Sequence, residues 1–411
     1  MSTSSSGKGA KPGVAGKHPA AKSWRPATQM VRGGTNRSSF GETAEALFLT
    51  SGYVYPSAEE AAARFSGDSE GFVYSRFANP TVAMFEDRMA LLEGAGAARA
   101  TATGMAAVTA AMLCHVSQGD HVVAARALFG SCRYIVDTLL PRFGVTHTYV
   151  DGRDIDAWRR AMRDTTKAVF FETPANPTLD VVDMKAVCDI AHAAGALVIV
   201  DNVFATPVLQ KPMEFGADVV VYSATKHIDG QGRCLGGAIV ASEEFIKDHV
   251  HNFLRQTGPA LSPFNAWVLL KSLETLELRI RQMCRNALEL AEFLDGHAKL
   301  AKVLYPGLES HPQHALAMRQ MAMGGSVITF ETKGGQEAAF RLANALSIVD
   351  ISNNLGDSKS LITHPRTTTH QRLTEEERQE MGIYAGTLRV SVGLEDAADL
   401  IEDFAQALEK V

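Results

Sequence analysis

The sequence predicts an α/β protein with a large, mostly parallel β-sheet and a smaller α+β region after it. From about residue 80, short β-branched or aromatic runs alternate with longer amphipathic stretches, a pattern typical of βαβ units. Several of these runs show little polar–apolar alternation, as expected for parallel strands covered on both faces. Past about residue 262 the chain changes to a long helical stretch with fewer strand candidates. We therefore expect a large sheet domain followed by a smaller C-terminal domain.

The individual elements follow in chain order. Residues 1–25 are rich in Ser, Gly, Ala and Lys, and bury too little apolar surface to offset the entropy of ordering, so a disordered tail is expected. Apolar residues at three- and four-residue spacings predict one long helix or a bent pair from about residue 262 to 297. Strands are expected at 121–125, 146–150, 168–172, 197–201, 219–223, 238–242, 326–330 and 388–392. Helices are expected at 80–93, 105–115, 184–194, 335–346, 372–381 and 395–409.

Composition excludes several classes of protein. The chain has 411 residues, and its 46% hydrophobic and 21% charged content is ordinary for a globular protein. A net charge of −6 argues against a nucleic-acid-binding surface, and no run of about 18 apolar residues predicts a membrane span. Five scattered cysteines without a CxxC pair indicate a reducing compartment, so a cytoplasmic location is expected. The His311–His314 pair lacks further His or Cys nearby, so no metal site is predicted.

The strongest local signal for chemistry is VVVYSATKHIDGQGRCLGG, residues 219–237. Ser223 and Thr225 lie two apart in extended chain and so face the same way, beside Lys226 and ahead of a Gly-rich loop. Both hydroxyls can bond one anionic group next to the lysine amine. The functional interpretation is a Schiff-base lysine anchored beside a phosphate. The alternative is a surface lysine at a strand end.

Three weaker signals agree with this interpretation. Asp201 ends a buried strand, where ligands bind in open α/β sheets, and could pair with a protonated pyridine nitrogen. Gly104 and Met105 open a small-residue helix, whose free N–H groups can bind phosphate. Arg389 lies on a late strand and offers a fork for a carboxylate. Taken alone, each residue is as readily a turn, a helix start or a salt-bridge partner.

In this order and spacing, the motifs resemble those of the Cys/Met-metabolism family of pyridoxal-phosphate (PLP) enzymes. The resemblance covers about residues 30–411 and rests on the segments VYSRFANPT, ATGMAA, ETPANPT, VDNVFATP, YSATKH and LRVSVGLE. It implies PLP as cofactor and the PLP-dependent transferase fold of the aspartate-aminotransferase type (fold type I), with a mostly parallel seven-stranded sheet. We accordingly expect an inter-subunit segment at 26–65, a PLP-binding domain at 66–262 and a C-terminal domain at 263–411. A homo-oligomer is also expected, most simply a tetramer built as a dimer of dimers.

Site residues carry over only at positions that match the family motifs. The resemblance implies that Lys226 forms the Schiff base and shuttles protons, while Asp201 holds the pyridinium proton. The implied phosphate ligands are Gly104, Met105, Ser223 and Thr225, joined by Tyr74 and Arg76, which reach the neighbouring subunit's cofactor. Phe129 would stack on the ring and Asn176 would lie near its 3-oxygen. Arg389 and Ser360 would receive the substrate α-carboxylate.

Further segments are similar to those of O-succinylhomoserine sulfhydrylases: SGYVYPSAEEAAARF, LFGSC, SATKHIDGQGRCLGG and ISNNLGDSKSLITHPRTTTH. This implies a transferase (EC 2.5.1 class) that converts O-succinylhomoserine and sulfide to homocysteine and succinate, in methionine biosynthesis. Most relatives carry Tyr where this chain has Phe129, which cannot donate a proton. A carboxylate leaving group, with a reference pKa of about 4, tolerates that loss better than a thiol, near about 8.5. Tyr74 from the neighbour is the next candidate acid.

Other activities stay open at this point. Cystathionine γ-synthase and O-acetylhomoserine sulfhydrylase share the first half of the reaction. A methionine or cystathionine γ-lyase would instead release an oxo acid and ammonia. Ser131 and Lys359 stand where those lyases carry Cys and Glu, which disfavours both. Outside PLP chemistry, a nucleotide-dependent oxidoreductase or a catalytically silent assembly protein would leave Lys226 with a structural role only.

Overall fold

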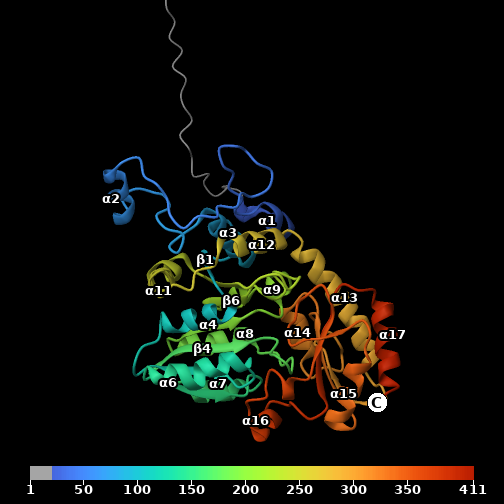
Figure 1. Ribbon diagram of the computed structural model, residues 1–411. Coiled ribbons are helices and arrows are strands. Elements are labelled where there is room, and N and C mark those ends of the chain that lie inside the picture. The colour runs from blue at the N-terminus through green and yellow to red at the C-terminus, as the bar shows by residue number, and fades with distance from the viewer. Residues whose placement is uncertain (1–20) are drawn as a thin grey trace, which may run out of the picture.

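A computed structural model describes residues 21–411, which form two helix-covered sheets and an N-terminal segment (Figure 1). Most of the predicted tail, residues 1–20, lies outside the described residues. The end of the predicted tail is ordered, because Ala21–Ser23 form a 3₁₀ turn (η1) and Ala21 is buried. The Gln29 side-chain amide donates to the Ala21 carbonyl at 3.1 Å, which fixes the turn to the first helix.

The large sheet has seven strands, and the prediction of a mostly parallel sheet is confirmed. The strands are β1 (Ala97–Thr101), β2 (His121–Ala125), β3 (Thr146–Val150), β4 (Thr166–Glu172), β5 (Leu197–Asp201), β6 (Val219–Ser223) and β7 (Gly237–Ala241), in spatial order β1-β7-β6-β5-β4-β2-β3. Strands β2 to β6 pair in parallel, and β7 runs antiparallel to both of its neighbours. The sequence missed β1, whose residues AARAT carry only one β-branched side chain.

Helices cover both faces of this sheet, which explains the absence of polar alternation in its strands. In β5, Val198 and Val200 belong to one apolar cluster and Ile199 to the other, and all three are fully buried. The helical segments of this domain are α3 (Pro80–Glu93), α4 (Gly104–Leu113), α5 (Gly130–Tyr134), η2 (Ile135–Leu139), α6 (Leu140–Arg142), α7 (Ile155–Ala161), α8 (Met184–Ala193), α9 (Thr206–Leu209), η3 (Pro212–Phe215), α10 (Glu243–Phe245), η4 (Ile246–His251) and α11 (Asn252–Thr257). Helix α3 has the predicted bounds, since Asn79 caps its start and Gly94 ends it in the left-handed conformation.

A bent helix pair leads into the C-terminal domain, as predicted. It comprises α12 (Pro263–Leu273) and α13 (Leu276–Leu294). The second sheet has the order β10-β11-β12-β9-β8, with β8 (Leu300–Leu304), β9 (Val327–Thr332), β10 (Asp350–Ile351), β11 (Leu361–Thr363) and β12 (Thr387–Ser391). Its helical segments are α14 (His314–Gln320), α15 (Gly335–Ala345), η5 (Pro365–Thr367), α16 (Glu375–Glu380) and α17 (Ala397–Leu408). Strands β8, β10 and β11 were not predicted, because each is short or interrupted by charge.

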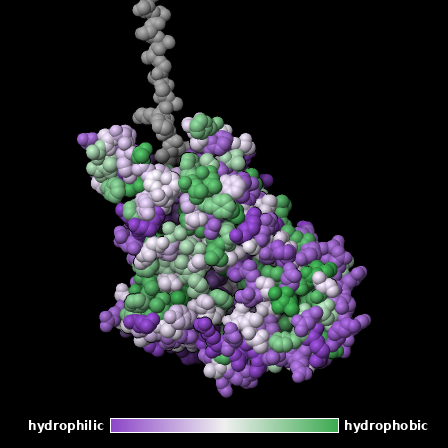
Figure 2. Space-filling view, viewed as in Figure 1, coloured by the Kyte–Doolittle hydropathy of each residue, from purple (hydrophilic) through white to green (hydrophobic). Residues whose placement is uncertain are grey.

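The N-terminal segment extends away from the sheet domain, with α1 (Pro26–Arg32) near the body and α2 (Ala58–Ser66) at the far end of a loop (Figure 1). It exposes large apolar side chains, including Phe40 (92% exposed) and Val54 (94% exposed). Figure 2 shows apolar surface on this upper part of the molecule. Within residues 21–411, no helix has both the length and the apolar character needed to cross a membrane.

Candidate active site

A cavity of about 750 Å³ opens where the carboxyl ends of β4, β5 and β6 meet the C-terminal domain. This is the expected ligand position in an open α/β sheet. Most of the predicted site residues line it: Gly104, Met105, Phe129, Asn176, Asp201, Ser223, Thr225, Lys226 and Arg389. Residues separated by up to 285 positions in the chain therefore meet at one site, since Gly104 and Arg389 both border it.

Lys226 follows β6 directly and presents its amine to the cavity. Its Nζ donates a hydrogen bond of 2.6 Å to Oδ1 of Asn354, a residue of the C-terminal domain. Burial and the nearby positive charge of Arg389 lower the pKa of the Lys226 amine to about 8. The uncharged amine, which is the nucleophilic form, is therefore far more abundant near neutral pH than for a lysine in water.

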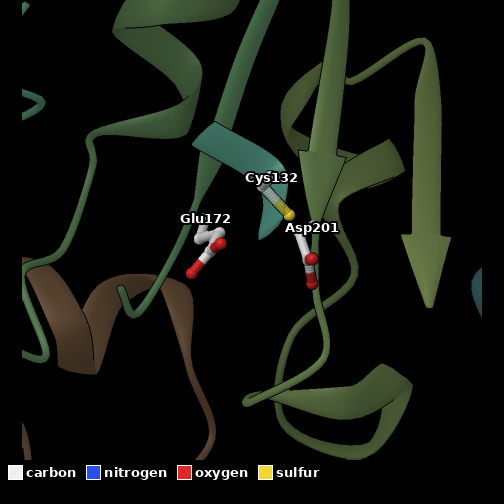
Figure 3. A group of neighbouring side chains, drawn as sticks. All are labelled: Cys132, Glu172 and Asp201. Carbon is white, nitrogen blue, oxygen red and sulfur yellow. The ribbon is translucent and has the colours of Figure 1, made fainter. Parts of the chain in front are cut away.

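Asp201 is part of a small acidic cluster at the ends of β4 and β5 (Figure 3). Its direct register partner in β4 is Glu172, and Cys132 from α5 reaches the same point. One carboxylate oxygen of each acid and the Cys132 Sγ all lie within 4.8 Å of one another. Burial raises the pKa of Asp201 to about 7, and burial together with Asp201 raises that of Glu172 to about 8. Burial keeps Cys132 a thiol, its pKa lying well above the usual value.

The opposite wall is suited to an anion. Helix α4 begins here, with Thr103 as its N-cap accepting from Ala106 N–H at 3.0 Å. The first backbone N–H groups of a helix have no intrahelical partners. A Cβ on Gly104 would lie 2.5 Å from Ser223 Cβ, so only glycine lets this helix start lie against the end of β6. The Ser223 hydroxyl has no hydrogen-bond partner among residues 21–411, whereas the Thr225 hydroxyl exchanges bonds with the backbone of Gly236.

Arg389 crosses from β12 into the cavity wall and is 1% exposed. It donates to Asn176 Oδ1 and to the backbone carbonyls of Asn353 and Asn354, each at 3.0 Å. A guanidinium has five N–H bonds. These three contacts leave two of them unused, including the buried Nε–H, which has no partner within the described chain. Arg389 is thus held by three acceptors and retains two N–H bonds, one on Nε and one on Nη1, that have no acceptor within the described chain.

Ser360 is the predicted site residue that the structure places elsewhere. It is buried behind the cavity and does not line it. Its hydroxyl donates to Glu395 Oε2 at 2.8 Å and accepts from Gly393 N–H at 2.8 Å. The hydroxyl is therefore occupied by partners within the protein, and the expectation that Ser360 receives a substrate carboxylate stays a prediction.

Tyr74 and Arg76 also lie outside the cavity of their own chain. Tyr74 is 41% exposed, and the Arg76 guanidinium lies 4.8 Å from the ring centroid of Phe77. Arg76 also donates to the Arg255 carbonyl. Their assignment to a neighbouring subunit's cofactor stays a prediction.

Two residues of the site were missed by sequence reasoning. Glu172 was quoted inside ETPANPT but not singled out, although its position at the end of a strand next to that of Asp201 was a usable signal. Asn354 had no such signal, because the packing of the two domains brings its loop to Lys226.

The geometry fits PLP as a resident cofactor. Lys226 offers an amine with a lowered pKa, and Asp201 offers a carboxylate for a protonated ring nitrogen. The start of α4 and the free Ser223 hydroxyl suit a phosphate. Phe129 borders the same cavity and offers an apolar ring face.

Comparisons with known proteins agree with this assignment. The family model described as Cys/Met metabolism PLP-dependent enzyme matches residues 27–409. The chain is 54% identical over 386 residues to O-succinylhomoserine sulfhydrylase of Mycobacterium tuberculosis, covering 93% of this chain and 95% of that protein. It is 50% identical to the protein of the same name from Pseudomonas aeruginosa, covering 93% and 94% of the two chains.

A solved structure from Campylobacter jejuni superposes with a TM-score of 0.90 at 33% identity, covering 94% of this chain and 100% of that one. It is described as a putative O-acetylhomoserine (thiol)-lyase with N'-pyridoxyl-lysine-5'-monophosphate. The fold type I architecture expected from the sequence is confirmed by this match. With a family model spanning nearly all of the described residues, the chain belongs to the Cys/Met metabolism family of PLP-dependent enzymes.

Proposed function

We propose that this protein is a PLP-dependent γ-replacement enzyme that joins sulfide to O-succinylhomoserine and releases homocysteine and succinate, a step in methionine biosynthesis. The observation that carries the proposal is the 50–54% identity, over 93% of the chain, to proteins named O-succinylhomoserine sulfhydrylase. The cavity supports it with residues suited to each task of such a reaction.

When bound, PLP supplies an electron sink for negative charge that develops on the substrate carbons. The positive charge and the unpaired N–H bonds of Arg389 orient the substrate by its α-carboxylate. Lys226 Nζ then lies in position to accept the α-proton and to carry a proton onward, since its pKa of about 8 suits both directions near neutral pH. Asp201 keeps the ring nitrogen protonated by providing the negative charge beside it.

Phe129 supports an acyl leaving group. It borders the cavity without a hydroxyl, and so offers a stacking face but no proton. Succinate departs as a stable anion, with a reference pKa of about 4, and needs little protonation. A thiol, with a reference pKa of about 8.5, would need an acid that Phe129 cannot be. This favours replacement on O-acylhomoserines over thioether cleavage by a γ-lyase.

We further propose a homo-oligomer, a tetramer in the simplest form, in the cytoplasm. The exposed apolar residues of segment 26–65 would be covered by a partner, and Tyr74 and Arg76, which do not reach their own cavity, would serve the partner's. In this arrangement residues 66–262 bind the cofactor, and residues 263–411 contribute Arg389 and Asn354 to the substrate side.

A substrate matrix tests the proposed function. Purified holoenzyme would be assayed with O-succinyl- and O-acetylhomoserine, each with sulfide and with cysteine, and with cystathionine and methionine alone. We expect the highest kcat/KM for homocysteine formation from O-succinylhomoserine and sulfide. Preference for cysteine would support a cystathionine γ-synthase instead, and release of ammonia and an oxo acid from thioethers at a comparable rate would support a lyase.

A further inference from the structure

The paired carboxyl groups of Glu172 and Asp201 have different surroundings. They end adjacent parallel strands in direct register, so their side chains emerge side by side at the cavity (Figure 3). Within residues 21–411 neither forms an ion pair with a lysine or arginine, and the third member of the cluster is the Cys132 thiol. Two like charges this close and shielded from water cannot both ionise cheaply. The pair therefore holds one proton over a wide pH range.

Glu172 also connects other residues of the site. Its Oε1 accepts from the backbone N–H of Phe129 at 2.5 Å, and its Oε2 lies 3.4 Å from the backbone N–H of Asn176. Asn176 in turn accepts from Arg389 through Oδ1. Glu172 thereby holds the backbone at Phe129 and also at Asn176, the residue that accepts from Arg389. Both side chains border the cavity, but Glu172 is only 5% exposed whereas Asp201 is partly exposed.

We propose that Glu172 is a positioning residue that retains a proton at neutral pH, directs it toward Asp201, and so leaves Asp201 as the one ionised carboxylate facing the cofactor ring. With PLP bound, Asp201 would accompany the protonated ring nitrogen, whereas Glu172 has no lysine or arginine partner within residues 21–411, so the shared proton would stay on Glu172. The lining cations, Lys226 and Arg389, bond to Asn354 and Asn176 rather than to either acid. Burial raises the pKa of both carboxyl groups, which agrees with one proton held by the pair.

Two substitutions distinguish the effect of the proton on Glu172 from the effect of the shape of its side chain. In Glu172→Gln the side-chain oxygen can still accept from Phe129 N–H, and the amide can donate to Asp201 as the acid would. In Glu172→Ala both backbone donors lose their acceptor in a buried place, which is costly. The matched control is Glu93→Gln: Glu93 is 1% exposed, its pKa is raised to about 7 by burial, and it bonds to Tyr222 outside the cavity.

The first readout is the dissociation constant of PLP from the apoprotein between pH 6 and 9, followed by absorbance with no substrate present. We expect Glu172→Gln to bind within about threefold of the parent at pH 7 and to lose the weakening that deprotonation of Glu172 causes above about pH 8. Glu172→Ala should bind at least about tenfold more weakly, in line with unsatisfied buried donors. Glu93→Gln should keep the parent's affinity and pH profile.

The second readout is infrared difference spectroscopy of the holoprotein, parent minus Glu172→Gln, at neutral pH, with and without ¹³C in the glutamate side-chain carboxyl groups. The carbonyl band of a protonated carboxylic acid should be lost in the variant, and in the parent that band should shift with the label. Gln as damaging as Ala, or a lost band that does not shift with the label, would mean that Asp201 holds the proton and would overturn the proposal. Parent-like affinity and pH profile in both variants would show that Glu172 positions nothing. If the Ala variant fails to fold, the Gln variant and the infrared band still decide whether Glu172 carries the proton.

Discussion

Replacing Arg389 with lysine should impair substrate recognition far more than cofactor binding. The guanidinium donates three N–H bonds to Asn176 Oδ1 and to the carbonyls of Asn353 and Asn354. Two further N–H bonds remain available to a ligand. A lysine retains the charge but has three donors on one nitrogen and no planar fork. A lysine that satisfied two of the three existing acceptors would have one N–H bond left for a substrate carboxylate. Loss of one charge-assisted bond costs about 1.5–3 kcal/mol, or about 10- to 150-fold in kcat/KM.

The assay is homocysteine formation from O-succinylhomoserine at saturating sulfide, with the PLP dissociation constant measured in parallel. Arg88→Lys is the matched control, because Arg88 is equally buried and donates to the carbonyls of Gly33 and Leu270 outside the cavity. It should lower thermal stability without a selective rise in KM. Unchanged kcat/KM in Arg389→Lys would refute the assignment of the carboxylate site, and an equal loss of PLP affinity would mean that Arg389 supports the cofactor instead.

Four further outcomes follow from the same geometry. Lys226→Ala should lose turnover while still binding PLP through the phosphate wall, and PLP should dialyse away even after borohydride treatment; near-normal activity would remove Lys226 from the chemistry. Uptake of PLP by the apoprotein should accelerate as pH rises, with a midpoint near pH 8, because only the uncharged Lys226 amine attacks and its pKa is lowered to about 8; stopped-flow absorbance would show a midpoint near about 10 if the amine were unperturbed. Mixed Arg76→Ala and Lys226→Ala subunits should regain partial activity, since a hybrid dimer has one intact site, and no recovery despite proven exchange would place both residues in one chain's site. Phe129→Tyr should raise cystathionine cleavage more than acyl replacement, which paired kcat/KM values would test; a parent enzyme that already cleaves cystathionine as fast would contradict the leaving-group argument.

The large sheet was predictable because its central strands carry their own signal. LVIVD and VVVYS are continuous β-branched runs, and the structure places strands with those bounds. Asp201 and Lys226 were found for the same reason, since each stands at or just beyond the carboxyl end of such a run. Strand β1 lacked that signal, because its pairing with β7 rather than its own composition makes AARAT extended.

The C-terminal side of the site was less predictable, because it depends on which way a loop faces. Ser360 and Asn354 lie on the same connection before and at β11, six positions apart. The serine turns inward to Glu395, whereas the asparagine turns to Lys226. Nothing in ISNNLGDSKS distinguishes these orientations before the two domains are packed. Local sequence could supply the residue types but not the side of the loop that reaches the cavity.

The arrangement of charge in the cavity links substrate binding to the lysine. Burial is the main reason that the pKa of Lys226 is lowered, and the positive charge of Arg389 is the second. A substrate carboxylate bound to Arg389 would offset that second contribution without changing the hydrogen bond from Lys226 to Asn354. The pKa of the amine would then rise, and a more basic amine is a better acceptor for the α-proton. In the free site the charge of Arg389 favours the uncharged amine of Lys226, and with the proposed substrate carboxylate bound, the same residue would favour Lys226 as a base.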